Sequence, residues 1–411
     1  MVALATFPAM LNRMKRLSLV CLLLLFVPSA PAAAQHPIVA LETLYEVDVG
    51  RSVTFVLSAR SASPIEAVSF QFRENGVSDV RFLPVAFEPG ATVRATATLN
   101  LSEYALTPFA RATYWWQVTD AADNILEIGP QPFQYDDSRF AWEAVDEANI
   151  NVHGYARPAE QLRAVLDEAL AAQALITRQL QVSELAVIDV YVYDDAEVMK
   201  AALPLHGRDS IKGYADPRHN IILISPGRAY ADLELRRLIP HEMAHIYIGQ
   251  IIGEAFAPAW LVEGLARFFE VEPDPDLRAL FEVGVQGEAL YPLAALCPPF
   301  PLDYTGFTLA YAQSYEVVRY IEGRFGPAGI RNLLEAYAQG ASCEGGVAQG
   351  LGLSLAALES DWLRAVRSGG EETSSPPTVW LWIVLLLTFA GWPAIFLTFR
   401  WRWAARRGTA G

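Results

Sequence analysis

The sequence is poor in cysteine, histidine and basic residues. Its 411 residues include three cysteines, six histidines and 31 lysines and arginines, against 46 aspartates and glutamates, so the formal net charge is −15. This shortage of positive charge argues against nucleic acid or another polyanion as a partner. The length of the chain predicts two or three domains.

The three cysteines allow at most one disulfide bond in the mature chain. Cys21 lies inside the apolar run of a predicted signal peptide and is lost when that peptide is cleaved. Cys297 and Cys343 remain, and two cysteines in an oxidising compartment can pair. Their separation along the chain does not show whether their geometry permits a bond, so this disulfide stays an open question.

Charge is also missing from long apolar runs near both ends of the chain. In residues 1–34, a group of basic residues precedes a short apolar run and then several small residues. This order is typical of a signal peptide that is cleaved after Ala34. An uncleaved membrane anchor is the alternative interpretation of the same signals.

The second apolar run, residues 379–399, is uncharged and long enough to cross about 30 Å of hydrocarbon as a helix. Four arginines follow it within residues 400–411, and basic residues stay on the cytoplasmic side of a membrane. The sequence therefore predicts a single-pass protein of the cell membrane with a short cytoplasmic tail. A polar linker at residues 369–378 would join the helix to domains outside the cytoplasm.

Residues 37–136 have the pattern of a β-domain. Stretches such as SVTFVLSA, AVSFQFRE and TYWWQVTD alternate apolar and polar residues, which places one face of each strand on a core. Turn signals such as ENG and EPG separate these stretches. We expect a β-sandwich of immunoglobulin or fibronectin-III type, without the disulfide of antibody domains because the segment has no cysteine.

Residues 144–368 mix helical and strand-like patterns. Ala159–Leu180 has apolar residues at helical spacing, and residues 185–193 and 220–227 read as strands. Helical patterns then dominate as far as Arg367. The predicted fold class is therefore multidomain, with an N-terminal β-sandwich, an α+β domain and one C-terminal transmembrane helix.

The stretch LRRLIPHEMAHIYIGQ carries two of the six histidines, four residues apart. On a helix His241 and His245 share one face, so both can bind one Zn²⁺. Glu242 is offset by about 100° from His241, where a carboxylate can take a proton from a water that zinc has acidified. A core helix with two incidental histidines is the alternative, but chance yields the HExxH spacing in such a chain on the order of once in a hundred.

A catalytic zinc needs a third protein ligand and an open coordination position. Glu263 lies in the apolar stretch WLVEGLARFFE, with 17 residues between it and His245. Its apolar neighbours argue against a glutamate that is simply solvated on a helix surface. Two histidines and this glutamate would complete a His₂Glu site.

HEMAH followed by WLVEGLARFFE resembles the gluzincin metallopeptidases, whose third ligand lies in a W-L-x-E-G-x-A helix. The closest resemblance is to the peptidase MA-like branch, which is related to aminopeptidase N and thermolysin, and it covers roughly residues 144–366. It implies that His241, His245 and Glu263 bind one catalytic Zn²⁺. It also implies that Glu242 is the general base and that the substrate is a peptide or protein.

A third stretch, TLAYAQSYEVVRYIEGRFG, resembles the helix that follows the zinc site in aminopeptidase-like gluzincins. In that family a tyrosine at the start of this helix donates to the oxyanion of the tetrahedral intermediate. The resemblance assigns this role to Tyr311, with Tyr315 one turn away as the alternative. A purely structural role as core aromatics is also open for both tyrosines.

The sequence departs from the related families in two ways. Thermolysin-like enzymes carry an aspartate four residues after the glutamate ligand, and it orients a histidine. This chain has Arg267 at that position. Glu270 is the candidate to orient a histidine instead, and a surface charge is the alternative interpretation of Glu270. The G-x-M-E-N segment that holds a substrate's free amine in aminopeptidases is absent, so their specificity does not carry over. Gly213 and Tyr214 are candidates to meet a substrate backbone by strand addition. Pro240 predicts a kink or the start of the site helix.

The leading hypothesis is a membrane-anchored, extracytoplasmic zinc metallopeptidase. The alternative is a non-catalytic, zinc-stabilised adhesion or assembly protein of the cell surface. All three ligands and the general base are present, whereas a degenerate site usually lacks one of them. That completeness favours the enzyme.

Overall fold

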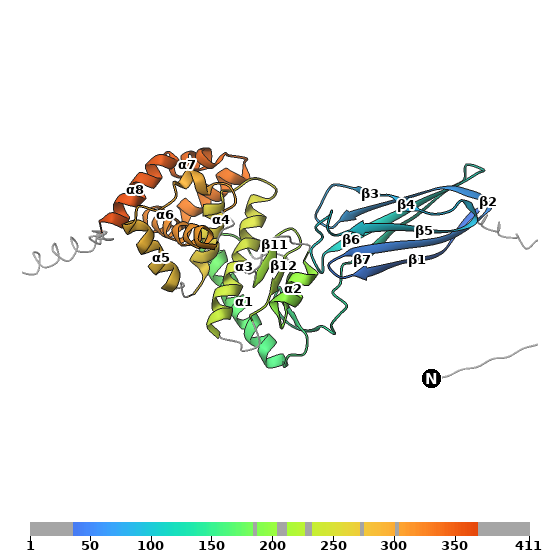
Figure 1. The fold of residues 1–411 in the computed structure, drawn as a ribbon, viewed down its shortest axis with the longest axis horizontal. Coiled ribbons are helices and arrows are strands. Elements are labelled where there is room, and N and C mark those ends of the chain that lie inside the picture. Colours follow the sequence, from blue (N-terminus) through green and yellow to red (C-terminus); the bar gives the residue numbers. More distant parts are fainter. Residues whose placement is uncertain are drawn as a thin grey trace, which may run out of the picture.

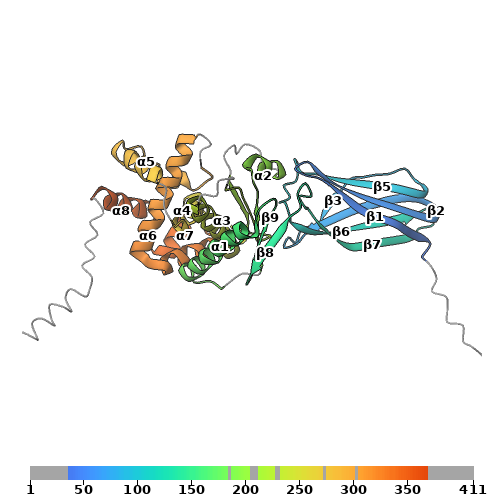
Figure 2. The same ribbon diagram turned by 90° about the horizontal axis from the view of Figure 1, so that it is seen from below.

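The computed structural model describes residues 36–183, 187–203, 212–226, 232–271, 275–300 and 304–368. They form an all-β unit, residues 38–135, and an α/β unit, residues 143–368. The β unit lies at one end of an elongated molecule and α4–α8 lie at the other, with the sheet of the α/β unit between them (Figure 1). Figure 2 shows the same order along the long axis after a turn of 90°.

The β unit is built around one long central strand. Its strands are β1 (Ile38–Asp48), β2 (Ser52–Glu74), β3 (Arg81–Leu83), β4 (Val85–Ala86), β5 (Gly90–Asn100), β6 (Arg111–Asp120) and β7 (Ile125–Gln134). The first half of β2 pairs with β1 and β5, and its second half pairs with β3 and β6, all antiparallel. The alternating apolar residues of these strands are buried in one core, as the sequence pattern predicts.

Hydrogen bonds join all seven strands into one sheet, which corrects the prediction of a β-sandwich with separate sheets. The stretches SVTFVLSA and AVSFQFRE are the two halves of the 23-residue β2 rather than two strands. A register shift between Arg60 and Ile65 bends β2. The ring centroids of Phe55 and Phe70 consequently come within 4.6 Å, and the sheet folds over a shared aromatic core. The prediction failed because the chain stays extended through the bend instead of forming a turn.

The sheet of the α/β unit has the strand order β11-β12-β10-β9-β8. Its strands are β8 (Glu143–Glu147), β9 (Ile150–Gly154), β10 (Ile188–Val192), β11 (Gly213–Asp216) and β12 (Ile221–Ile224). The three inner strands are parallel, and the edge strands β8 and β11 pair antiparallel. Val190 and Ile222 face the helices, whereas Tyr191 and Leu223 face the β unit, so both faces are covered.

Helices form the rest of the α/β unit. They are α1 (Ala159–Leu180), α2 (Ala196–Ala202), α3 (Asp232–Ile252), α4 (Ala259–Phe269), α5 (Pro275–Gln286), the 3₁₀ helix η1 (Leu293–Leu296), α6 (Tyr304–Ala338), α7 (Cys343–Leu351) and α8 (Leu355–Arg367). α4 packs closely on α6, as Gly264 shows: a Cβ there would lie 2.5 Å from the Ser314 carbonyl oxygen. This contact fixes one of the two helices that form the candidate site.

Aromatic side chains join the β unit to the second sheet. The ring of Phe109 stacks on Tyr191 at a centroid separation of 3.5 Å, and Trp142 packs edge-on against Tyr191 and Tyr193. The Tyr193 hydroxyl donates to the buried Asp137 carboxylate at 3.0 Å. The β unit therefore packs directly on the α/β unit through a filled interface.

The predicted C-terminal transmembrane helix is corrected as well. Within the described residues, no helix combines the length and the apolar character that a membrane crossing requires. The predicted signal peptide (1–34), linker (369–378), membrane helix (379–399) and tail (400–411) lie outside the described residues. The described residues form a multidomain fold without such a helix.

Candidate metal centre

Two histidines of α3 face the same point. His241 and His245 lie one turn apart, and their Nε2 atoms are 3.3 Å from each other. The opposite side of α3 is buried in the core through residues such as Ile239, Met243 and Ile246. Tertiary packing of the apolar side therefore holds both imidazoles on the free side of the helix.

Helix α4 brings a carboxylate to these imidazoles. Glu263 Oε2 lies 3.8 Å from His241 Nε2 and 3.7 Å from His245 Nε2. Glu263 Oε2 is buried and has no hydrogen-bond partner among the described residues. A buried carboxylate oxygen without a donor is costly, so this geometry calls for a cation.

The three side chains fit a zinc ion. One ligand atom from each of His241, His245 and Glu263 lies within 4.8 Å of the other two. Tetrahedral Zn²⁺ with bonds of about 2.0–2.1 Å sets its ligand atoms roughly 3.3 Å apart, so small side-chain movements suffice to close the site. Two imidazole nitrogens and one carboxylate form the His₂Glu donor set of catalytic zinc sites.

Glu270 orients the first of these histidines. Its Oε1 lies 3.0 Å from His241 Nδ1, and its side chain is only 3% exposed. With Nδ1 donating to this carboxylate, Nε2 of His241 is left to bind a metal. Arg267 Nη1 contacts both Glu270 oxygens, at 3.1 and 3.3 Å, and holds the carboxylate in place.

The electrostatics of the pair suit metal binding. Burial lowers the pKa of the His241 imidazole well below its usual value, and the neighbouring His245 and Arg267 lower it further. A neutral imidazole is the form that binds zinc. His241 is therefore kept ready for a metal at neutral pH.

Glu242 lies beside the three candidate ligand residues, and its pKa is shifted from the usual value. Burial raises the pKa of Glu242 to about 8, with Glu263 and Glu270 adding to the shift and Arg267 opposing it. A bound dication would act in the same direction as Arg267. Glu242 therefore has the acidity of a group that can both take and return a proton.

A glycine of the edge strand makes room for Glu242. A Cβ at Gly213 would lie 2.2 Å from Glu242 Oε1, so no larger residue fits there without displacing the carboxylate. Gly213 begins β11, whose second residue, Tyr214, has its hydroxyl oxygen 3.4 Å from Thr107 Oγ1 of the β unit. Gly213 therefore lies next to Glu242, and Tyr214 follows it on the same short strand.

Pro240 has a specific effect on the site. α3 begins eight residues earlier, at Asp232, so Pro240 is internal and does not start the helix. Without a Pro240 N–H, the Arg236 carbonyl lacks its usual helical donor. That carbonyl instead accepts a hydrogen bond of 3.2 Å from the Val271 N–H. Pro240 thereby ties the end of α4, next to Glu270, to the helix that carries His241.

The two candidate tyrosines lie on α6. Tyr311 packs against the rings of Phe300 and Phe307, and the Arg267 guanidinium lies 5.0 Å from its ring centroid. Tyr311 is therefore linked to the metal centre through Arg267. Burial raises the pKa of Tyr315, which lies one turn further along. The contact between Arg267 and Tyr311 was not anticipated, because residue spacing on α4 says nothing about which element packs over it.

A disulfide supports the same region. Cys297 and Cys343 are bonded, with their Cα atoms 6.1 Å apart. The Cys297 carbonyl accepts a hydrogen bond of 3.0 Å from the N–H of Ala259, the first residue of α4. The bond thus ties α7 to the beginning of the helix that carries Glu263.

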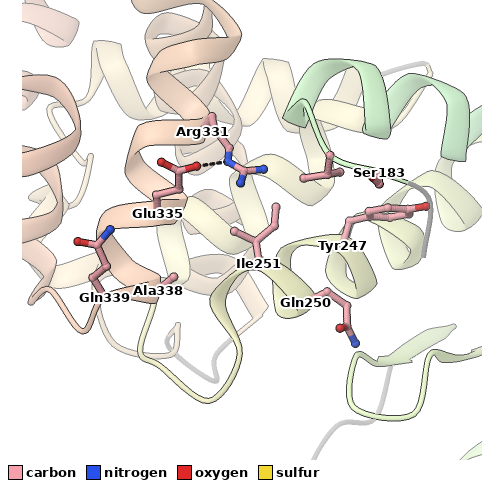
Figure 3. A pocket seen from close by; sticks show the side chains of 9 residues that line it. Ser183, Tyr247, Gln250, Ile251, Arg331, Glu335, Ala338 and Gln339 are labelled. Atoms are coloured by element: carbon pink, nitrogen blue, oxygen red, sulfur yellow. Dashed lines mark hydrogen bonds and ion pairs between the residues drawn. The ribbon is translucent and has the colours of Figure 1, made fainter. Parts of the chain in front are cut away.

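A groove among the described residues lies away from this site. A groove of about 520 Å³ lies between the end of α1, α3 and α6, and Tyr247, Gln250, Arg331 and Glu335 line it (Figure 3). At about 100° per residue, Tyr247 and Gln250 point away from the face of α3 that carries the histidines. This groove is therefore separate from the metal centre.

Comparison with known proteins places the site in a family. Residues 166–368 match the Peptidase MA superfamily. Yeast LTA4 hydrolase is similar in structure, with 10% identity, a TM-score of 0.37, and coverage of 85% of this chain and 68% of that one. An M1 zinc metallopeptidase from Deinococcus radiodurans has 14% identity and a TM-score of 0.36, with coverage of 80% and 94%.

No curated protein sequence matches the chain. The family match spans α3, α4 and α6, which carry every candidate metal ligand and catalytic residue. The prediction of a gluzincin-like hydrolase is thereby confirmed. Over residues 166–368 this chain is similar to the Peptidase MA superfamily, and it is an enzyme of the zinc metallopeptidase type.

Proposed function

We propose that the chain hydrolyses peptide bonds with one zinc ion held by His241, His245 and Glu263. The observation that carries this proposal is the buried, unpartnered Glu263 Oε2, which lies less than 4 Å from both imidazole Nε2 atoms. When bound, zinc would supply a Lewis acid that polarises the substrate carbonyl and acidifies the attacking water. The substrate is a peptide or protein, as the family implies.

Glu242 is the proposed general base and acid. It is buried, directly follows His241 in the sequence, and packs against the Gly213 backbone. Glu242 takes the proton of the attacking water and then gives it to the leaving amine. The tight contact with Gly213 would hold the carboxylate in one orientation during both transfers.

Tyr311 is the proposed donor to the developing oxyanion. Negative charge accumulates on the former carbonyl oxygen, and a hydroxyl donor there stabilises the transition state more than the substrate. The Arg267 guanidinium beside the Tyr311 ring favours that role electrostatically. Tyr315 remains the alternative donor on the same helix.

The edge strand β11 is the proposed binding strand for the substrate backbone. β11 pairs on one side with β12 and begins at Gly213, next to Glu242. An extended peptide adding to its free side would pass the general base, and backbone hydrogen bonds would supply affinity with little sequence selectivity. Gly213 and Tyr214 are the proposed contact residues.

The test is a purified protein assayed for zinc and for cleavage of a peptide library. Wild type is expected to contain one zinc per chain and to cleave peptides. Glu242→Gln should keep the zinc and lose activity by about 10³-fold or more. Glu282→Gln on the exposed face of α5 is the matched control and should behave as wild type. Absence of zinc from wild type, or full activity of Glu242→Gln, would contradict the proposal.

We also propose that the protein folds in an oxidising compartment. The bonded pair Cys297 and Cys343 supports this, because such bonds persist outside the reducing cytosol. Mass spectrometry of protein purified under alkylation from its native host should find the two thiols blocked. Free thiols at both positions would contradict it.

A further inference from the structure

The turn between β11 and β12, residues 217–220, is held from two sides. On one side lies α3, where Gln250 Nε2 donates to the Pro217 carbonyl and to Asn220 Oδ1, the latter at 3.1 Å. A Cβ at Gly249 of α3 would also lie 2.3 Å from the Pro217 side chain. On the other side lies the β unit, which makes a set of buried polar contacts with the same turn.

Asp216, the last residue of β11, is the first of these contacts. Thr107 Oγ1 of the β unit donates to Asp216 Oδ2 at 2.5 Å. The same carboxylate accepts from the Arg218 N–H at 2.9 Å and lies 2.8 Å from His219 Nδ1. A charged acceptor strengthens each of these hydrogen bonds, so this end of β11 is firmly fixed to the β unit.

His219 forms the second contact. Its Nε2 lies 3.5 Å from Glu74 Oε2 at the end of β2, and the two side chains are 6% and 4% exposed. The Tyr104 hydroxyl donates to Glu74 Oε1. A buried polar chain thus runs from Tyr104 and Glu74 through His219 and Asp216 to Thr107, and both of its ends belong to the β unit.

These contacts lie a short distance from the candidate site. β11 has four residues, so Asp216 and Gly213 are separated by roughly 10 Å of extended backbone. Gly213 lies against Glu242, and among the described strands β11 pairs with β12 alone. A strand this short with a single neighbour depends on side-chain contacts to keep its position.

We propose that Thr107, Glu74 and His219 are positioning residues that hold β11 beside Glu242, so that the β unit is part of the substrate site and not a spacer. The part of this proposal that concerns the substrate rests on the proposed function, because it takes β11 as the strand that binds the substrate backbone. None of the three residues touches the reacting atoms. They act through Asp216 and the backbone of β11.

The first variant to test is Thr107→Val, which keeps the shape of the side chain and removes the donor to Asp216. Hydrogen–deuterium exchange of the full chain is expected to become about tenfold faster in residues 212–216. Zinc content should be unchanged. The KM for a cleaved peptide should rise several-fold while kcat stays within about twofold of wild type. Thr107→Ser retains the hydroxyl and should restore both readouts.

Glu74→Gln is the second variant and removes the charge that faces His219. It should raise exchange in the same residues, which separates the proposal from any local defect at Thr107. Tyr135→Phe is the matched control, because its hydroxyl joins Gly50 and Ala202 across the same interface without touching β11. It should leave exchange in β11 at the wild-type rate.

Two outcomes would overturn the proposal. One is wild-type exchange in residues 212–216 for both Thr107→Val and Glu74→Gln. The other is equally fast exchange in Tyr135→Phe, which would show that any loosening of the interface has the same effect. Because exchange is measured without substrate, a wild type that cleaves no peptide would refute the proposed function and leave this test of positioning intact.

Discussion

Two polar clusters of this chain are built from the same kinds of side chain and differ in how completely they are satisfied. In one, His241 lies between the carboxylates of Glu263 and Glu270. In the other, His219 lies between those of Asp216 and Glu74. Both clusters are mostly buried, so neither can rely on water to satisfy its polar atoms.

The His219 cluster supplies donors to both of its carboxylates, although His219 Nε2 has no hydrogen-bond partner among the described residues. Asp216 accepts hydrogen bonds from a hydroxyl and a backbone N–H and faces an imidazole nitrogen, and Glu74 accepts from Tyr104. The His241 cluster does not, since Glu263 Oε2 has no donor among the described residues and two imidazole nitrogens converge on it. Composition is the same in both clusters, so the clearer mark of the ligand-binding one is a buried carboxylate oxygen that lacks a donor among the described residues.

The largest expected effect comes from removing a ligand. His245→Ala should lose the zinc and lower peptidase activity by about 10³-fold or more, because the remaining donors cannot hold the ion or complete the site. His219→Ala is the matched change in the other cluster and should retain one zinc per chain. Elemental analysis and peptide cleavage measure both. Zinc loss in His219→Ala would show that the two clusters do not differ in this way.

The next effect concerns the orientation of His241. Glu270→Gln should weaken zinc binding by about 10–100-fold, since the amide is a poorer partner for His241 Nδ1 than the carboxylate. Glu74→Gln, the equivalent change beside His219, should leave zinc affinity unchanged. Competition with a metal chelator gives both affinities. Equal affinities for Glu270→Gln and wild type would show that Glu270 is only a structural partner of Arg267.

A smaller effect is expected from crowding the general base. Gly213→Ala should lower peptidase activity by about tenfold while keeping the zinc, because the added methyl displaces Glu242 without touching a ligand. Gly90→Ala in the β unit is the control, since a Cβ there meets its nearest atom at 3.6 Å. Steady-state kinetics with matched zinc content measures the change. An active Gly213→Ala enzyme would mean that Glu242 does not depend on its contact with β11.

The smallest effect is a pH dependence of the His219 cluster. Burial alone would raise the pKa of Asp216, but hydrogen bonds from His219 and Thr107 outweigh burial and lower it. A lowered folded-state pKa stabilises the fold above about pH 4, and that contribution is lost as the pH falls through the folded value. The stability difference between wild type and Asp216→Asn should therefore shrink by about 1 kcal/mol on acidification. Urea unfolding between pH 3 and 6 measures it, and parallel curves would refute this account.

Local patterns in the sequence predicted much of the peptidase domain. The helix predicted at Ala159–Leu180 matches α1 in both bounds, and residues 185–193 and 220–227 contain β10 and β12. The two motifs placed the candidate metal ligands on separate helices, and the structure brings those side chains together. Helical periodicity and family motifs are local signals, so they can be recognised without knowledge of the tertiary fold.

Long-range features were missed for the opposite reason. The continuity of β2 through its bend depends on pairing with strands that are distant in sequence. Pro240 leaves the Arg236 carbonyl without its helical donor, and this carbonyl accepts a hydrogen bond from the Val271 N–H just after the end of α4. The contacts of Thr107 with Asp216 and of Arg267 with Tyr311 likewise join residues whose spacing carries no signal. Such contacts follow from packing between elements.

The most direct test of the central claim is anomalous diffraction at the zinc absorption edge from crystals of the zinc-loaded protein. We expect one strong peak within about 2.0–2.2 Å of His241 Nε2, a His245 nitrogen and a Glu263 carboxylate oxygen. The absence of a peak at this position, or a zinc ion bound there without Glu263, would contradict it.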